Sequence, residues 1–141
     1  MSVFSKTYAG RISEIRSDVV ISSSFSDADG SDGASCTALW DTGANASAIS
    51  NKVAQKLGLV AIDHASVETA NGKCEAPIYL VDFTLPERNR VKRIKVMGTN
   101  LNICDALIGM DIITLGDLLV TNAPNTRFEF RLPSKGAPSL K

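Results

Sequence analysis

Asp41 is the residue in this chain whose surroundings point most directly to chemistry. An apolar run at residues 37–40 leads straight into it, and Thr42, Gly43 and Ala44 follow at once. Such a run is typical of a buried strand, and a carboxylate at its end costs free energy unless another group pairs with it or shares a proton with it. Gly43 and Ala44 leave room for backbone or another subunit to come close. The pattern therefore indicates a catalytic carboxylate, although aspartate and glycine are also common in ordinary turns after strands.

The elements that must position Asp41 follow a mostly-β pattern. Residues 18–25 and 36–40 are expected to form a hairpin around the turn-rich loop at 26–35. Further strands and short apolar runs are expected at residues 48–49, 77–85, 91–97, 104–109, 118–121 and 127–132. A short helix is expected at 110–115.

Capping and turn residues mark where several of these elements begin and end. Ser50 has the position of a helix N-cap, and Gly58 has that of the stop at the other end. The pair Asn71 and Gly72 favours a hairpin, because both residues tolerate a positive φ. Asp111 is expected to cap the short helix, since aspartate is among the best capping residues.

Length and composition predict a single domain. The chain has 141 residues, of which 44% are hydrophobic and 21% charged, and its formal net charge is zero. One core of ordinary size fits this length. The neutral balance gives no reason to expect nucleic acid or an anionic membrane as the main partner, and no apolar segment is long enough to span a bilayer.

The cysteines and the N-terminus favour a reducing, cytoplasmic setting. The first residues lack the core of a signal peptide. Cys36, Cys74 and Cys104 are odd in number and lie among apolar or small residues, so we interpret them mostly as buried thiols. Together with His64 they lack the paired-ligand spacing of a zinc site. We expect no metal ion and no cofactor.

A second motif, Leu107-Ile108-Gly109, is an apolar pair followed by glycine. Together with residues 41–44 and the Asn-Gly hairpin, it resembles the retropepsin-like aspartic proteases, the single-domain class that includes the retroviral proteases and their bacterial relatives. The resemblance covers residues 15–132, most of the chain. It therefore implies a protease domain at 15–132, with an N-terminal segment at 1–14 before it and a flexible tail at 133–141 after it. It implies a closed, mostly-β barrel with one or two short helices that works as a homodimer.

The resemblance also implies roles in catalysis. Asp41 would be the catalytic carboxylate, on a turn completed by Thr42, Gly43 and Ala44. Residues 107–109 would pack behind that turn. Peptide hydrolysis needs an activated water and a proton for the leaving amine, and two carboxylates that share one proton can supply both. The chain has one Asp-Thr-Gly motif, so the second aspartate would come from another copy in a two-fold dimer.

Substrate binding would involve the hairpin and the residue after the catalytic turn. Ala70, Asn71 and Gly72 would form a flap over an extended peptide, which would lie between the flap and the two aspartates. Asn45 would contact the substrate main chain. Asn45 stands where many viral members have an acidic residue, and the flap has a single glycine where viral flaps are often glycine-rich.

Other functions remain open at this point. The chain could be a peptide-binding or dimerisation module that kept the fold and lost hydrolysis, or a monomeric glycosidase with two carboxylates. A triad enzyme would need His64, the only histidine, and no nucleophile turn lies near it. Asp27, Asp29 and Asp32 lack the ligand spacing of a calcium loop. The basic residues between 88 and 95 are explained by a strand with a charged outer face.

Overall fold

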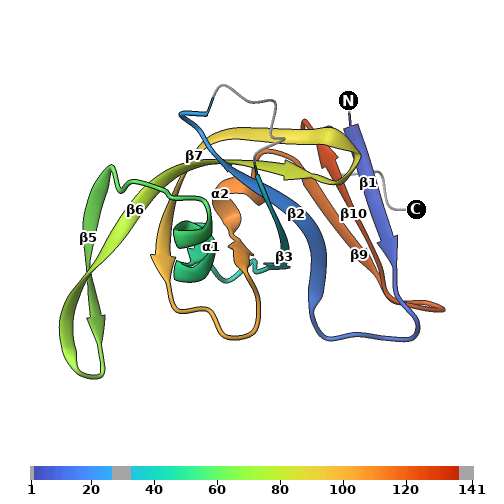
Figure 1. Cartoon of the computed structure of the whole chain (residues 1–141). Coiled ribbons are helices and arrows are strands. Elements are labelled where there is room, and N and C mark those ends of the chain that lie inside the picture. The colour runs from blue at the N-terminus through green and yellow to red at the C-terminus, as the bar shows by residue number, and fades with distance from the viewer. Residues whose placement is uncertain (1, 27–32, 137–141) are drawn as a thin grey trace.

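The computed structural model describes residues 2–26 and 33–136. It is 55% strand with two short α-helices, so the mostly-β prediction is confirmed. The elements form a closed barrel, a hairpin that extends from it, and a separate three-stranded sheet (Figure 1).

Six strands of the described chain close into the barrel that the resemblance implies. They are β2 (Ile15–Ser23), β3 (Ala34–Trp40), β4 (Ala48–Ser50), β6 (Gly72–Leu85), β7 (Asn89–Thr99) and β8 (Ala106–Ile108). Neighbours follow the order β2, β3, β8, β4, β7 and β6, and a further pairing of β6 with β2 closes the ring. The expected first hairpin is confirmed, because β2 and β3 pair antiparallel.

Alternating burial explains why β3 forms part of the barrel wall. Ala34, Cys36, Ala38 and Trp40 are buried, whereas the residues between them are more exposed. This is the period of two that a strand with one buried face requires. Trp40 also donates a 2.8 Å hydrogen bond from Nε1 to Oγ of Ser17. The residue directly before Asp41 is therefore fixed by both packing and a hydrogen bond.

The hairpin predicted at Asn71 and Gly72 is present, and it projects from the barrel (Figure 1). Its first strand is β5 (Asp63–Thr69), which pairs antiparallel with the beginning of β6. Thr69 lies opposite Gly72, and Gly72 has a φ of 106°. The sequence did not predict β5, because most of its residues are polar and exposed and show no apolar alternation.

The second sheet joins both ends of the chain. Its strands run in the order β1 (Ser2–Thr7), β10 (Arg127–Leu132) and β9 (Asp117–Thr121), all antiparallel. Phe4, Phe128 and Phe130 are buried on its inner face. The ring centroid of Phe130 lies 4.9 Å from that of Trp40. This sheet therefore packs against the end of β3 that leads into Asp41.

The helix after β4 begins and ends as the sequence predicts. It is α1 (Asn51–Lys56), and Ser50 Oγ accepts a 3.1 Å hydrogen bond from the backbone N–H of Val53. Gly58 follows the helix with a φ of 62°. A short 3-10 turn, η1 (Pro86–Arg88), connects β6 to β7.

The second helix differs from its prediction. α2 (Met110–Ile113) is shorter than residues 110–115, and its N-cap is Gly109. The prediction that Asp111 caps this helix is wrong, because Asp111 lies inside its first turn. Its carboxylate instead accepts hydrogen bonds from Ser47, a residue that follows the turn at residues 41–44.

The prediction of buried thiols is wrong for one cysteine. Cys36 is buried and Cys104 is half-buried, but Cys74 is exposed. Cys74 lies on the projecting part of β6, where no core packs against it. No helix among the described residues is long and apolar enough to cross a membrane.

The start of the expected tail is held against β9. Asp117 accepts hydrogen bonds from Ser134 Oγ at 2.5 Å and from the backbone N–H of Lys135 at 2.6 Å. These hydrogen bonds lower the pKa of Asp117 to about 2. The rest of the tail, residues 137–141, lies outside the described residues, as do residues 27–32 of the predicted loop with their three aspartates.

Candidate active site

Asp41 lies where β3 stops pairing with β8. The two strands run parallel, with Trp40 opposite Ile108. The backbone N–H of Asp41 then donates a 2.9 Å hydrogen bond to the carbonyl of Ile108. Two buried barrel strands therefore fix the position of the Asp41 backbone.

The carboxylate of Asp41 is oriented by its own turn. The N–H of Gly43 donates a 2.9 Å hydrogen bond to Asp41 Oδ1, and the N–H of Ala44 donates to the Asp41 carbonyl at 3.2 Å. A Cβ at position 43 would lie 3.2 Å from that same Oδ1, so glycine leaves the carboxylate uncrowded. The side chain is half-buried, while Thr42, Gly43 and Asn45 around it are exposed. The turn thus presents an oriented carboxylate that water can reach.

Gly109 packs directly behind this turn. A Cβ there would lie 2.8 Å from the carbonyl oxygen of Ala44 and 2.9 Å from two backbone atoms of Ala46. The N–H of Met110 donates a 2.8 Å hydrogen bond to the same Ala44 carbonyl. Only a residue without a side chain permits this close approach. The hydrogen bond from Met110 joins the turn to the start of α2.

Ser47 and Asp111 form a network that the sequence did not predict. Asp111 accepts hydrogen bonds from the N–H of Ser47 at 2.9 Å and from its Oγ at 2.7 Å. Ser47 Oγ in turn accepts a 3.0 Å hydrogen bond from the N–H of Gly109. Ser47 is buried. The end of the Asp41 turn is therefore joined to α2 through a buried hydroxyl. In the sequence, the only signal for this contact is a small polar residue within an apolar stretch.

A cavity of about 410 Å³ opens beside Asp41. Besides Asp41 and Thr42, its lining comes from the segment before and within β2, from β3 and from β9: Ser13, Glu14, Ile15, Leu39, Trp40, Leu118 and Val120. The sequence predicted none of the contributions from residues 13–15 or from β9, because they depend on how the two sheets pack. The carboxylate therefore borders a mostly apolar recess.

The residues predicted to form a flap lie apart from the Asp41 turn within this chain. Ala70, Asn71 and Gly72 are exposed at the tip of the β5–β6 hairpin, which extends away from the barrel (Figure 1). The hydrogen bonds at the tip are local: Thr69 Oγ1 donates to the Gly72 carbonyl at 2.8 Å and accepts from the N–H of Asn71 at 3.2 Å. The structure thus brings residues 107–109 to Asp41 and leaves the predicted flap residues at a distance.

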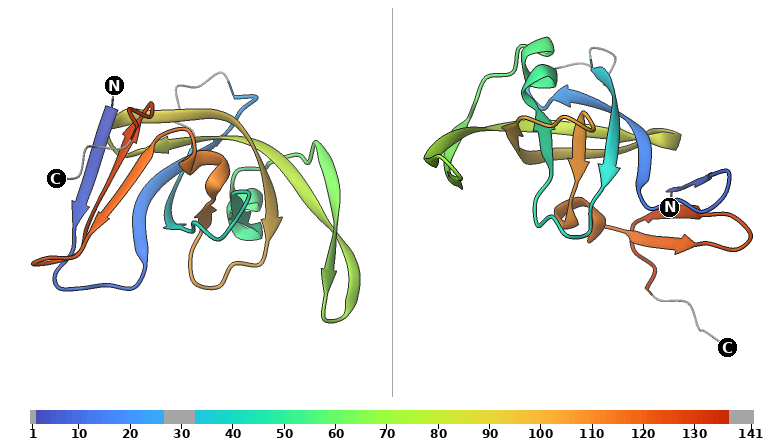
Figure 2. Two further views of the ribbon diagram at one scale, coloured as in Figure 1. Left: turned by 180° about the vertical axis from the view of Figure 1, so that it is seen from behind. Right: turned by 90° about the horizontal axis from the view of Figure 1, so that it is seen from below.

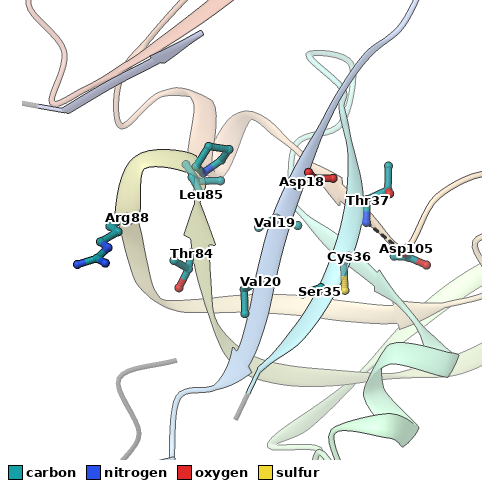
Figure 3. Close-up of a pocket in the computed structure, with 11 residues that line it drawn as sticks. Asp18, Val19, Val20, Ser35, Cys36, Thr37, Thr84, Leu85, Arg88 and Asp105 are labelled. Carbon is teal, nitrogen blue, oxygen red and sulfur yellow. Dashed lines mark hydrogen bonds between the residues drawn. The ribbon is translucent and has the colours of Figure 1, made fainter. Parts of the chain in front are cut away.

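Another cavity, of about 620 Å³, lies between β2, β3 and the end of β6 (Figure 3). Of its two carboxylates, Asp105 accepts a 2.8 Å hydrogen bond from the N–H of Thr37 and so supports β3. Burial raises the pKa of the Cys36 thiol in the same lining to about 11, which keeps it protonated and unreactive at neutral pH. Among residues 2–26 and 33–136, no three histidine, cysteine or acidic side chains gather to hold a metal ion. The Asp41 turn is therefore the better candidate for an active site.

A comparison with protein families points to the same turn. The family model described as "gag-polyprotein putative aspartyl protease" matches residues 31–114, which is more than half of the chain. The chain belongs to the retropepsin-like aspartic proteases. Within this retropepsin-like chain the matched region contains the Asp41 turn, the hairpin and residues 107–109.

Solved structures show the same retropepsin-like fold. A retropepsin-like aspartic protease from Rickettsia conorii has a TM-score of 0.63 at 16% identity, and 93% of each chain is covered. Simian foamy virus (mac) protease has a TM-score of 0.52 at 16% identity, with 70% of this chain and 91% of that one covered. EIAV protease has a TM-score of 0.50 at 15% identity, with 72% of this chain and 86% of that one covered. No curated protein matches the chain.

Proposed function

We propose that this retropepsin-like chain is an aspartic endopeptidase that works as a homodimer, with Asp41 and the partner's Asp41 activating the attacking water. One observation carries the proposal: a half-buried carboxylate stands at the end of a buried barrel strand and accepts a 2.9 Å hydrogen bond from Gly43. Residues 107–109 hold the turn from behind. Membership of an aspartic protease family supports the same assignment.

A second copy is needed because, among residues 2–26 and 33–136, no second carboxylate stands on a turn of this kind. Asp111 accepts hydrogen bonds from Ser47 behind the turn. Glu14 lines the same cavity as Asp41 but forms an ion pair with Arg16 at 2.8 Å. The chain also has only one Asp-Thr-Gly motif. A two-fold axis beside the turn would place two Asp41 side chains together, and two close carboxylates share one proton rather than both ionising.

The chemistry then follows from that shared proton. The ionised Asp41 takes a proton from water while the water oxygen attacks the carbonyl carbon of the peptide. The protonated Asp41 donates a hydrogen bond to the carbonyl oxygen and stabilises the charge that develops there. The Asp41 that took the proton from water then gives it to the amide nitrogen, the C–N bond breaks, and the amine leaves. The two apparent pKa values of such a pair belong to both residues together.

The substrate would be a peptide in extended conformation. Gly43 and Asn45 are exposed beside Asp41 and offer backbone and amide groups to a substrate main chain. Ala70, Asn71 and Gly72 at the hairpin tip would cover the peptide from the other side. Such a peptide adds as a strand, with alternate side chains in pockets.

The substitution Asp41→Asn tests the assignment. Asparagine keeps the size of the side chain and an oxygen that can accept from Gly43, so the fold should persist, but it cannot take a proton from water. We expect at least a ~10³-fold loss of peptide cleavage, measured by mass spectrometry on a mixed peptide library at mildly acidic pH. The matched control is Asp63→Asn, an exposed aspartate on β5, which should keep full activity. Cleavage that survives in the Asp41 variant, or disappears in the Asp63 variant, contradicts the proposal.

Mixed dimers test whether the site is shared. Co-expression of wild-type and Asp41→Asn chains should give inactive heterodimers, so activity should follow the fraction of wild-type homodimer. Activity that follows the total amount of wild-type chain instead would mean that each copy works alone. Intact dimers that bind peptides without cutting them would identify a binding module.

A further inference from the structure

We propose that the cavity of about 620 Å³ between β2, β3 and the end of β6 binds a short peptide whose two ends are free. The ammonium group of the peptide would lie at Asp18 and Asp105, and its carboxylate at Arg88. The volume is typical of ligand pockets, which measure about 300–1,000 Å³. The binding does not depend on the proposed function, but the source of such peptides, as products of hydrolysis, rests on it.

This cavity is separate from the site at Asp41. It shares no lining residue with the cavity beside Asp41. Its residues from β3 belong to the first half of that strand, and the turn that carries Asp41 follows the other end of β3 (right-hand view of Figure 2). A peptide bound in this cavity would therefore leave the Asp41 turn accessible.

The floor of the cavity is the outer face of the barrel. Val19 and Cys36 are buried in the core, so their neighbours along β2 and β3 face outward. Val20 lies opposite both Ser35 and Thr84, and these three residues form a row across three strands. Oγ1 of Thr84 is buried and has no hydrogen-bond partner among the described residues. A peptide backbone along this row would supply a partner for it.

Two carboxylates mark one end of the cavity. Asp18 lies opposite Thr37, and the N–H of Thr37 donates a 2.8 Å hydrogen bond to Asp105 Oδ2. Facing side chains on neighbouring strands have Cβ atoms ~5 Å apart, so the two carboxylates flank Thr37 on its two sides. An ammonium group placed against Thr37 would be attracted by both carboxylates and has several N–H donors to share between them.

Arg88 stands at the other end of the cavity (Figure 3). Its side chain is exposed, and none of the four ion pairs among residues 2–26 and 33–136 involves Arg88, Asp18 or Asp105. Glu87 and Arg88 have φ angles of 62° and 59°, which residues with side chains rarely adopt. Backbone strain of this kind is concentrated at functional sites such as ligand clamps. A guanidinium group matches the geometry of a carboxylate, so Arg88 suits the C-terminal end of a peptide.

The separation of the two charged ends fits about four residues. The end of β6, β2, β3 and the segment at Asp105 are successive neighbours, because the N–H of Asp105 donates a 3.0 Å hydrogen bond to the carbonyl of Thr37. Neighbouring strands lie ~4.8 Å apart, so three spacings give ~14 Å. An extended peptide advances ~3.3 Å per residue, so four residues span ~13 Å.

Peptides with blocked ends test the proposal. In the Asp41→Asn variant, isothermal titration calorimetry measures the Kd of tetra-alanine, its N-acetyl form and its C-terminal amide, and mass spectrometry checks that the peptides stay intact. We expect each blocked form to bind at least ~10-fold more weakly, because it loses one charged hydrogen-bonding end. A peptide bound at Asp41 would not show this preference, since an endopeptidase binds the interior of a peptide. Equal binding of all three forms, or no binding of tetra-alanine, overturns the proposal.

Substitutions at the two ends test which residues bind the charges. Arg88→Gln should weaken tetra-alanine ~10-fold and leave the amide unchanged, so the two peptides should bind equally. Asp18→Asn should reduce the preference for tetra-alanine over its N-acetyl form. The matched control is Arg93→Gln, at an exposed arginine outside the cavity with the same φ of 59°, which should leave every Kd unchanged. Equal weakening by both arginine substitutions would reduce the effect to net charge and overturn the proposal.

The results also separate this site from the proposed function. Binding that depends on both free ends, in a protein that cleaves no peptide, would support this site and overturn the endopeptidase. Cleavage by a protein that binds free and blocked peptides equally would support the endopeptidase and overturn this site.

Discussion

The turn that carries Asp41 and the tip of the β5–β6 hairpin are both loops with a proposed role at the active site, yet the chain holds them differently. The turn is fixed at its start by the hydrogen bond from Asp41 to Ile108, and at its end by the contacts of Ser47 with Asp111. Residues 70–72 at the hairpin tip are exposed, and their hydrogen bonds stay within the tip.

This difference matches the two tasks proposed for these loops. A catalytic carboxylate must keep one geometry, and burial with a connected hydrogen-bond network provides that. A segment that covers peptides of different sequence must adjust, and few buried contacts permit local opening at low free-energy cost. The same small substitution should therefore have unequal effects in the two loops.

The largest effect is expected from Gly109→Ala. The new Cβ would lie 2.8–2.9 Å from backbone atoms of Ala44 and Ala46, and backbone cannot move aside as the end of a side chain can. We expect a loss of about 3 kcal/mol in the free energy of unfolding and a fall in kcat, because the turn would shift. Urea denaturation and peptide cleavage measure the two. A variant that is as stable and as active as wild type would show that the close approach behind the turn is dispensable.

An intermediate effect is expected from Asp111→Asn. The amide has one oxygen in place of two, so it cannot accept both hydrogen bonds from Ser47 in their present geometry, and its NH₂ group would replace one of the two acceptors. We expect a loss of about 2 kcal/mol in the free energy of unfolding and a lower kcat with little change in KM. The control is Asp63→Asn, an exposed aspartate on β5, which should change stability by less than ~0.5 kcal/mol. Equal losses of unfolding free energy in both variants would show that the contact between Ser47 and Asp111 has no special role.

The smallest effect is expected from Gly72→Ala at the hairpin tip. No atom lies within 4 Å of the new Cβ, so the cost comes from the φ of 106° alone. We expect about 1 kcal/mol, confined to the hairpin, and detectable as faster amide hydrogen exchange in β5 and β6. The global unfolding free energy should stay close to that of wild type. A loss as large as that of Gly109→Ala would mean that both loops are equally integrated into the fold.

Local signals made part of this structure predictable. The N-cap at Ser50 and the hairpin near Gly72 depend on residues close together in the chain, and both predictions are confirmed. β1 and β5 were not predicted, because their strand character comes from pairing with β10 and β6 and not from an apolar pattern of their own. The prediction that Asp111 caps α2 failed for a related reason, because its partner Ser47 is distant in sequence.

The sequence alone determined the β-rich character of the chain and the candidate catalytic turn, because alternating burial and turn chemistry are properties of short segments. The tertiary structure decided what surrounds Asp41. It placed Glu14, Leu118 and Val120 around the cavity, hydrogen-bonded Ser47 to Asp111, and left β9 at the edge of its sheet. These features arise where strands from opposite ends of the chain pack together, and no local pattern of residues specifies such contacts.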